Sequence, residues 1–439
     1  MRRMTSQVNI RKIIPVALAF SVICTVQIIF LSILPSELSK NESPDFTVFY
    51  SVIADRLAEG ENFKSSFYFK GVGNDALPSD ENGYFVTRWP PGHSIIIGAI
   101  YSVADHLVVS RNKLTKFIFF IFYTFSSYLI YKITKLFFQN WIPALSAIIW
   151  ATYPFNLWLT KQPNSEIPFL IFLYWSIYLF IIGTRSNSTK HIIGASVLIS
   201  ISMLTRAASI LVPIIFVIIY LIYAIYNHNL KNGPNYVNIL KKSLIMIIIP
   251  IVVTAPWEII VYKETGKILP LTSTGSDLIR VANMNILKPR PDGSLIVSND
   301  LKVMLVSTLS DEESCSIIEE YCDLNTPKIT VKPTSFISAE LYWIKFKRAF
   351  YGVDTKRFED EVTIIQWLYF IPAAFGLVLT LRKRNTTILT LVITGLSLYF
   401  LAINIIGLPL LRYMLPAYGL YAIYAACSVD WLYRKLLTK

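Results

Sequence analysis

Long apolar segments alternate with shorter polar loops along most of the chain. About 20 apolar residues are enough for a helix to cross a bilayer, and continuous runs favour helices over a membrane β-barrel. About ten segments fit this description: Ile13–Leu34, Phe117–Tyr131, Trp141–Leu159, Ile167–Gly183, Ile192–Leu204, Ile210–Tyr226, Leu244–Ile260, Val362–Leu381, Ile388–Ile406 and Met414–Val429. The pattern predicts an all-α polytopic membrane protein with about ten transmembrane helices.

One shorter apolar stretch, Ile95–Val109, decides the topology. If it spans, every later loop changes side. If it lies at the interface or re-enters, the basic clusters fall on the cytoplasmic side, as the positive-inside rule requires. We therefore expect interfacial helices in the first outer loop, an uncleaved first span, and both termini in the cytoplasm of a plasma (inner) membrane protein.

Polar segments divide the chain into three parts. Residues 1–262 form an N-terminal transmembrane module whose first outer loop covers residues 35–116. Residues 263–361 form an extracytoplasmic loop region, which we expect to cover the site and help select the acceptor. A poorly ordered loop is the alternative for that region. Residues 362–439 form the C-terminal transmembrane helices.

Composition agrees with a membrane protein. The chain is 54% hydrophobic and has a mean hydropathy of +0.51. Its net charge of +13 is explained by cationic cytoplasmic loops, and no nucleic-acid-binding motif accompanies it. Cys315 and Cys322 share a polar loop and can form a disulfide if that loop faces an oxidising compartment. No cysteine and histidine spacing indicates zinc.

Ionisable residues near the ends of apolar runs supply the candidate chemistry. With the topology above, one group gathers on the outer side: Asp45, Arg88, Lys161, Glu166, Arg206, Glu258 and Arg412. Charges at membrane depth often mark functional sites. A carboxylate can act as a general base, arginines can neutralise a departing phosphate, and paired carboxylates can hold a divalent cation. Sugar transfer from a lipid phosphate fits this set.

Simpler explanations exist for the same residues. Asp45 lies in the expected first turn of a helix starting near Ser43, where the helix dipole favours an acid. The same holds for Glu166. Arg206 and Arg412 can extend from helix ends towards the interface.

Several motifs, in this order, resemble the C-type (GT-C) membrane glycosyltransferases. The similarity is to the protein O-mannosyltransferase-like branch (glycosyltransferase family 39-like), which also contains the lipid A aminoarabinose transferases. The motifs are the acid Asp45 with the pattern that ends at Gly60, RWPPGHS at Arg88–Ser94, and segments within Tyr153–Phe169, Gly194–Ser209, Ala255–Gly275 and Leu411–Tyr418.

The resemblance implies a GT-C fold and an inverting transfer at the extracytoplasmic face. The donor would be a polyprenyl-phosphate-linked hexose or pentose, and the acceptor a hydroxyl of a glycan, lipid or protein. Asp45 matches the general base and Arg88 a residue near the donor phosphate. Glu166 matches the acid of the second outer loop, and Arg206 and Arg412 match further substrate-binding positions.

A divalent cation, Mg or Mn, held by Asp45 and Glu166 stays open. Many relatives have a second acid where this chain has Phe46, and an Arg-Asn pair where it has Ile260 and Val261. Two other functions also stay open. A transporter or lipid-linked sugar flippase would spread charges through the bilayer depth. A non-catalytic assembly subunit would tolerate replacement of Asp45.

Overall fold

The structure is a computed structural model of the chain, and it describes residues 10–33, 46, 50–61, 63–65, 79–80, 83–85, 89–161, 163–228, 235–272, 342–343, 345–353, 359–381, 383–407 and 409–437. Asp45, Arg88, Cys315 and Cys322 lie outside these residues. The expected disulfide and the role of the 263–361 region therefore stay predictions.

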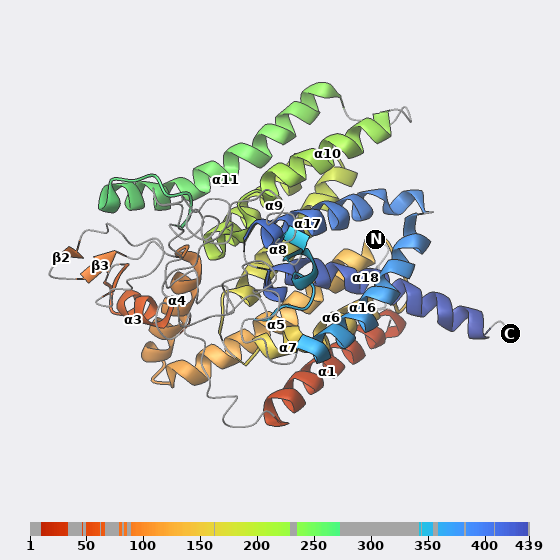
Figure 1. Cartoon of the computed structure of the whole chain (residues 1–439), viewed down its shortest axis with the longest axis horizontal. Coiled ribbons are helices and arrows are strands. Elements are labelled where there is room, and N and C mark those ends of the chain that lie inside the picture. The colour runs from red at the N-terminus through yellow and green to blue at the C-terminus, as the bar shows by residue number, and fades with distance from the viewer. Residues whose placement is uncertain are drawn as a thin grey trace, which may run out of the picture.

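The described chain is predominantly helical, as the apolar runs predict (Figure 1). Within it, seven helices are long and apolar enough to cross a membrane. They are α1 (Ile10–Ile33), α5 (Arg111–Lys135), α8 (Glu166–Arg185), α10 (Val212–His228, preceded by a 3₁₀ turn at Ala207–Ser209), α11 (Tyr236–Thr265), α16 (Glu359–Leu381) and α17 (Thr387–Ile406). The other expected spans correspond to α6 (Ile142–Ala151) with α7 (Pro154–Leu159), to α9 (Thr189–Thr205) and to α18 (Leu411–Leu437).

The expected span Trp141–Leu159 is broken rather than continuous. Tyr153 has an extended backbone (φ −63°, ψ 117°), and Pro154 follows it at the start of α7. Proline lacks a backbone donor and disfavours helical geometry in the residue before it. The chain therefore ends α6 at Ala151 and begins a separate short helix.

The two ends of the bundle are defined here by α8. We call the end where α8 begins the Glu166 end, and the other the Arg185 end. Arg185 Nη1 donates a 2.8 Å hydrogen bond to the carbonyl of Leu136, directly after α5, so α5 also finishes at the Arg185 end. Arg206, directly after α9, pairs with Glu166, so α9 finishes at the Glu166 end. In Figure 1 the Glu166 end is on the left, and α18 finishes on the right.

The helix α4 (Gly92–His106) starts and finishes at the Glu166 end. A Cβ on Gly92 would lie 2.7 Å from the carbonyl oxygen of Leu204, in the last turn of α9. Near the other end of α4, Asp105 accepts a 2.8 Å hydrogen bond from Arg111 Nε, at the start of α5. The helix therefore does not run from one end of the bundle to the other, which agrees with the interfacial placement expected for Ile95–Val109.

The first loop is more ordered than the sequence suggested. Its helix α3 (Ser51–Ala58) packs against α4. Three short strands, β1 (Lys64–Ser65), β2 (Ser79–Asp80) and β3 (Gly83–Phe85), form an antiparallel sheet in the order β1-β3-β2. The sequence patterns described above did not predict these strands.

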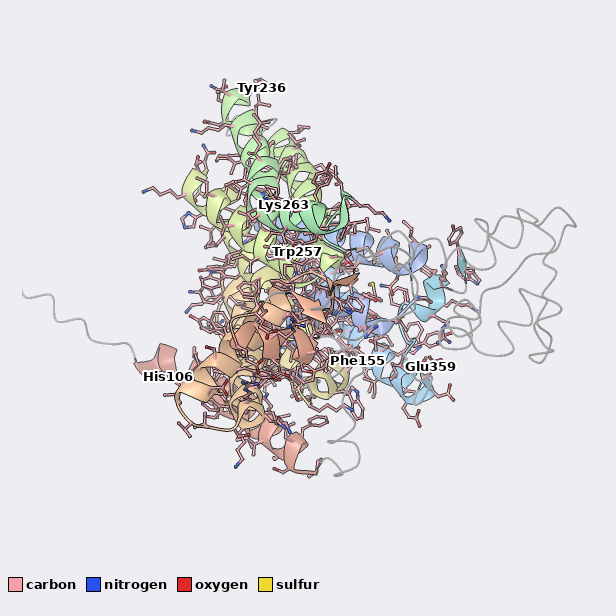
Figure 2. The ribbon with its side chains drawn as sticks, turned by 90° about the vertical axis from the view of Figure 1, so that its left-hand side faces the viewer. His106, Phe155, Tyr236, Trp257, Lys263 and Glu359 are labelled. Atoms are coloured by element: carbon pink, nitrogen blue, oxygen red, sulfur yellow. The ribbon has the colours of Figure 1, made fainter. Side chains whose placement is uncertain are left out.

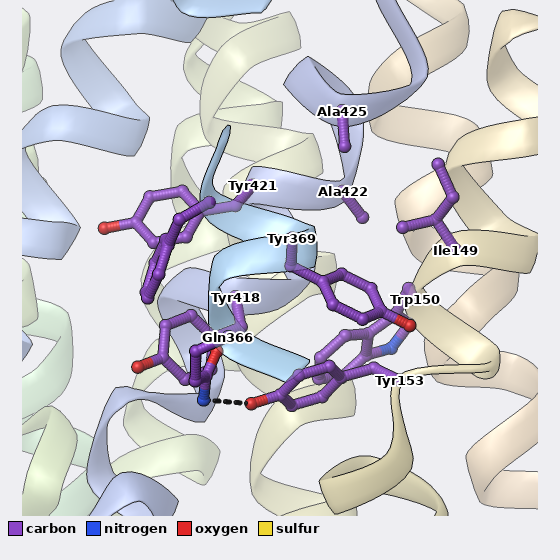
Figure 3. Close-up of a pocket in the computed structure, with 10 residues that line it drawn as sticks. Ile149, Trp150, Tyr153, Gln366, Tyr369, Tyr418, Tyr421, Ala422 and Ala425 are labelled. Carbon is purple, nitrogen blue, oxygen red and sulfur yellow. Dashed lines mark hydrogen bonds between the residues drawn. The ribbon is translucent and has the colours of Figure 1, made fainter. Parts of the chain in front are cut away.

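Aromatic side chains join α6, α16 and α18 inside the bundle (Figure 3). The Tyr153 ring makes edge contacts with Tyr369 at 4.9 Å and with Tyr418 at 5.6 Å between centroids. Gln366 Nε2 donates a 2.6 Å hydrogen bond to the Tyr153 hydroxyl, and a small cavity remains between these residues and Trp150. Edge-to-face contacts of this kind add stabilisation beyond that of burial. They therefore stabilise the backbone conformation of Tyr153, where the helix is broken before Pro154.

A short segment, residues 345–353, connects the starts of α16 and α18. The buried Arg348 binds Glu359 with both terminal nitrogens, at 3.0 Å (Nη1–Oε2) and 2.6 Å (Nη2–Oε1). The carbonyl of Gly352 accepts a 2.8 Å hydrogen bond from the amide of Leu411, the first residue of α18. The next residue is Arg412, so this clamp fixes the start of the helix that carries it.

Candidate active site

Glu166 begins α8 and is only 4% exposed. The local sequence Asn164-Ser165-Glu166-Ile167-Pro168 suits a helix start, with a polar capping residue and a proline in the first turn. An acid at this position interacts favourably with the positive end of the helix dipole. Burial of a carboxylate is nevertheless costly unless it is paired and hydrogen-bonded.

Arg206 is the partner of that carboxylate. It ends α9 with an extended backbone (φ −152°, ψ 120°), which turns the chain into the 3₁₀ turn at Ala207–Ser209. Its Nη1 lies 2.7 Å from Glu166 Oε1 and donates a 3.2 Å hydrogen bond to Ser165 Oγ. Burial disfavours the charged guanidinium, but Glu166 together with the hydroxyls of Tyr413 and Tyr50 raises the pKa of Arg206.

Arg412 brings a second guanidinium to the same place. Arg206 and Arg412 lie over one ring, that of Tyr413, at 5.1 Å and 5.4 Å from its centroid. The charge of Arg412 also acts on Glu166 and Arg206. The described part of this cluster contains two guanidiniums and one carboxylate, so the net charge of these three groups is positive. Such a site suits an anionic ligand.

His93, from the RWPPGHS motif, supports the cluster. It is fully buried, and its Nε2 lies 2.8 Å from the carbonyl oxygen of Pro163. A carbonyl only accepts, so Nε2 carries the proton and Nδ1 does not. Burial lowers the pKa of His93 to about 4, which keeps it neutral at pH 7. This contact joins the start of α4 to the loop before Glu166.

Tyr50 connects the first loop to the same residues. Its hydroxyl donates a 3.5 Å hydrogen bond to Ser165 Oγ, and its ring makes an edge contact with His93 at 4.4 Å. Ser165 thus lies between Tyr50 and Arg206. Neither His93 nor Tyr50 was predicted as a site residue. The only sequence signal was their position inside motifs that were noted for Asp45 and Arg88.

Asp45 and Arg88 themselves lie outside the described residues. Their chain neighbours Phe46 and Trp89 are described, and both belong to the hydrophobic cluster that contains Tyr50. The rings of Tyr50 and Trp89 are 6.1 Å apart. The roles of Asp45 and Arg88 stay predictions. The residue that follows each of them in the chain, Phe46 or Trp89, packs in the same hydrophobic cluster as Tyr50.

Lys161 and Glu258 contact groups other than Glu166, Arg206 and Arg412. Lys161 Nζ is 3.9 Å from the centroid of the Trp158 ring. Glu258 Oε1 accepts a 2.6 Å hydrogen bond from the amide of Leu271, beside Trp257. Figure 2 views this end of the molecule and shows Trp257 on α11 and Phe155 on α7. Of the outer ionisable residues that are described, the structure brings together Glu166, Arg206 and Arg412.

A metal site receives no support from the donor set at Glu166. Glu166 Oε1 is already bound by Arg206, and Arg412 adds a second positive charge nearby. Repulsion from these charges disfavours a cation at this carboxylate. Among the residues that the structure describes, no group of three or more His, Cys, Asp or Glu side chains is arranged to hold a metal ion.

Comparison with known proteins supports the family resemblance. Residues 89–257 match the family model described as dolichyl-phosphate-mannose-protein mannosyltransferase, a range that includes Glu166 and Arg206. No curated protein matches the chain in sequence.

Solved structures match over most of the chain. The apo oligosaccharyltransferase of Archaeoglobus fulgidus superposes with a TM-score of 0.55 and 11% identity, covering 97% of this chain and 51% of that one. The same enzyme in complex with an inhibitory peptide and a dolichol-phosphate gives 0.51 and 12%, with coverage of 89% and 46%. The chain thus spans about half the length of these proteins. ArnT from Cupriavidus metallidurans, bound to undecaprenyl phosphate, gives 0.43 and 12%, with coverage of 95% and 76%.

The helical architecture and the matches to the archaeal oligosaccharyltransferase confirm the fold expected from the motifs. The chain has the fold of the C-type (GT-C) membrane glycosyltransferases, and its residues 89–257 match the model of the dolichyl-phosphate-mannose-protein mannosyltransferase family.

Proposed function

We propose that the protein transfers one hexose or pentose from a polyprenyl-phosphate donor to an acceptor hydroxyl, at the Glu166 end of the bundle. The observation that carries the proposal is the cluster of Glu166, Arg206 and Arg412 at one end of a GT-C fold, where the described residues bring two guanidiniums to one buried carboxylate. The family match and the dolichol-phosphate bound in the archaeal enzyme support a lipid phosphate as the anion.

The reaction would be a single displacement with inversion, as the resemblance implies. The acceptor oxygen attacks the anomeric carbon, and the bond from that carbon to the phosphate oxygen breaks. The acceptor proton passes to the Asp45 carboxylate. The electron pair of the broken bond leaves with the polyprenyl phosphate, which gains one negative charge.

Each site residue has a distinct part in this scheme. Asp45 is the general base, and Arg88 and Arg412 bind the phosphate as its charge grows. Arg206 is positioned by its ion pair with Glu166. Its N–H groups that do not contact Glu166 add positive electrostatic potential to the site. The charges around Glu166 disfavour a cation at that carboxylate, so the scheme gives Glu166 no metal, and the divalent cation expected at Asp45 stays a prediction.

Orientation in the membrane follows from charge. Lys132, Lys135 and Arg185 belong to the last turns of α5 and α8 at the Arg185 end, and Arg434 and Lys435 end α18. The positive-inside rule then places the Arg185 end in the cytoplasm and the Glu166 end outside. This agrees with cytoplasmic termini in a plasma (inner) membrane.

Transfer assays with the purified full chain test the proposal. The donors are a panel of radiolabelled polyprenyl-phosphate sugars, and the acceptors are crude envelope fractions. We expect Asp45→Asn to lower turnover by about 10²–10⁴-fold and Arg412→Gln by about 10²–10³-fold, in proportion to the loss of a general base and of an oxyanion contact.

Glu258→Gln is the matched control, since Glu258 is a partly buried acid at the same end whose partner is the Leu271 amide. It should leave turnover within about threefold. Turnover by Asp45→Asn equal to that of the unaltered protein rejects the assignment of the base. Movement of lipid-linked sugar across vesicles, with no transfer from any donor, indicates a flippase instead.

A further inference from the structure

A second pocket lies at the Arg185 end, at the far side of the bundle from the Glu166 cluster. Its volume is about 380 Å³, many times the roughly 10–15 Å³ that one water needs. It is formed by the α5–α6 loop, the end of α16 and the last turns of α18. Its wall includes the charged or aromatic residues Phe137, Phe138, Lys383, Asp430, Trp431 and Arg434.

Aromatic and basic residues place this pocket at the level of lipid headgroups. Lys383 Nζ lies 5.7 Å from the Phe138 centroid, and Lys435 Nζ lies 4.9 Å from that of Trp431. Beside it, Trp141 and Tyr433 meet edge to face at 5.6 Å. Tryptophan, tyrosine and extended basic side chains gather where hydrocarbon meets headgroups. Exposed Leu432, Leu436 and Leu437 give α18 an apolar surface here.

The charges inside the pocket are of both signs. Asp430 is 7% exposed, and its Oδ2 accepts a 2.8 Å hydrogen bond from Arg434 Nε. Its Oδ1 is buried and accepts no hydrogen bond from the described residues. Lys383 is exposed and, in that same part of the chain, forms no ion pair. A buried carboxylate oxygen without a donor indicates a missing hydrogen-bond partner.

We propose that this pocket binds the phosphoethanolamine headgroup of a zwitterionic phospholipid in the membrane leaflet at the Arg185 end. The primary ammonium pairs with the Asp430 carboxylate, which lines the pocket, and the phosphate contacts Lys383 and the Arg434 side of the pocket. The acyl chains continue along the apolar surface of α18. A choline headgroup has no N–H to give Asp430, and a glycerol headgroup offers only a neutral hydroxyl. The proposal does not depend on sugar transfer at the other end.

Lipid binding to the purified full chain tests this. The protein is placed in nanodiscs of phosphatidylcholine with an equal fraction of phosphatidylethanolamine or phosphatidylglycerol, and bound lipids are counted by native mass spectrometry. We expect phosphatidylethanolamine to be retained at least about tenfold more strongly than phosphatidylcholine, since one charge-assisted hydrogen bond is worth roughly this factor. Free phosphoethanolamine should compete only at much higher concentration, because it lacks the acyl chains.

Two variants separate the parts of the pocket. Asp430→Asn should remove the preference for the ethanolamine headgroup while retention of phosphatidylglycerol stays unchanged. Lys383→Gln should weaken both lipids. Lys190→Gln removes an exposed charge at the same end, outside the pocket wall, and should change neither.

Equal retention of the ethanolamine and choline lipids by the unaltered protein overturns the proposal without any variant. A preference for phosphatidylglycerol alone overturns it in favour of a general anion site. Competition by free phosphoethanolamine as strong as by the intact lipid shows a soluble ligand instead.

Discussion

Replacing Glu166 with glutamine would expose how strongly the cluster depends on its ion pair. The Glu166 and Arg206 side chains are 5% and 15% exposed and 2.7 Å apart, so water screens their attraction little. Removing one partner of such a pair costs roughly 3–5 kcal/mol, because the other charge stays buried without compensation. At about 1.4 kcal/mol per factor of ten, the unfolding equilibrium should shift by roughly 10²–10³·⁵.

The glutamine amide oxygen can still accept from Arg206, and Arg206 keeps its 3.2 Å hydrogen bond to Ser165. We therefore expect the lower part of that range. Unfolding in mixed SDS and detergent micelles, followed by tryptophan fluorescence, measures the difference. Glu59→Gln, an exposed acid after α3, is the control and should stay within about 0.5 kcal/mol of the unaltered protein.

A double-mutant cycle with Arg206→Met isolates the pair itself. Once the arginine is gone, Glu166→Gln should no longer destabilise and should even relieve an unpaired buried carboxylate. The two changes together should then cost less than their sum by more than about 1 kcal/mol. Additive effects, or a single-variant cost below about 0.5 kcal/mol, would show that the pair is screened and refute the reasoning.

Three further changes test the supports of the site. Gly92→Ala places a Cβ 2.7 Å from a backbone oxygen and should cost about 1–3 kcal/mol in thermal unfolding, whereas Gly194→Ala meets only a side-chain methyl and should be mild. The unfolded chain binds a proton on His93 near pH 6.5 and the folded chain only near 4, so stability should fall by about 3 kcal/mol as the pH drops from 6.5 to 4. In His93→Gln this loss should disappear from pH-dependent melting curves. Arg348→Lys retains the charge but loses the two-point contact with Glu359, and it should raise the KM for donor lipid if the clamp positions α18. An unchanged KM would mean that the clamp serves stability only.

The helices and part of the site could be predicted from the sequence because both depend on local pattern. Apolar runs of sufficient length give spans, and Glu166 and Arg206 each stand at the end of one. If α4 does not cross the membrane, the later spans alternate in direction. Both residues then lie at the same end of the bundle, although 40 positions separate them in the sequence. Their 2.7 Å contact required the structure.

His93 and Arg348 show why the rest could not be predicted. The partner of His93 is a backbone carbonyl 70 residues away, and no side-chain pattern marks a carbonyl. Arg348 lies in the region expected to be an extracytoplasmic loop, yet its side chain is 1% exposed and pairs with Glu359. Both contacts depend on tertiary approach, which hydrophobic periodicity does not encode.

Basic residues have different surroundings at the two ends, and that difference argues that sugar transfer takes place at the Glu166 end. At the Arg185 end, Arg185 and Lys435 are exposed and rest on aromatic rings, an arrangement that needs no counter-ion. At the Glu166 end, the Arg206 side chain is only 15% exposed, pairs with Glu166, and shares the Tyr413 ring with Arg412. Two guanidiniums this close repel each other, which lowers stability and which Glu166, the carboxylate paired with Arg206, only partly offsets. Binding of an anion would offset this repulsion. The cluster would stabilise most strongly a phosphate whose negative charge grows during the reaction.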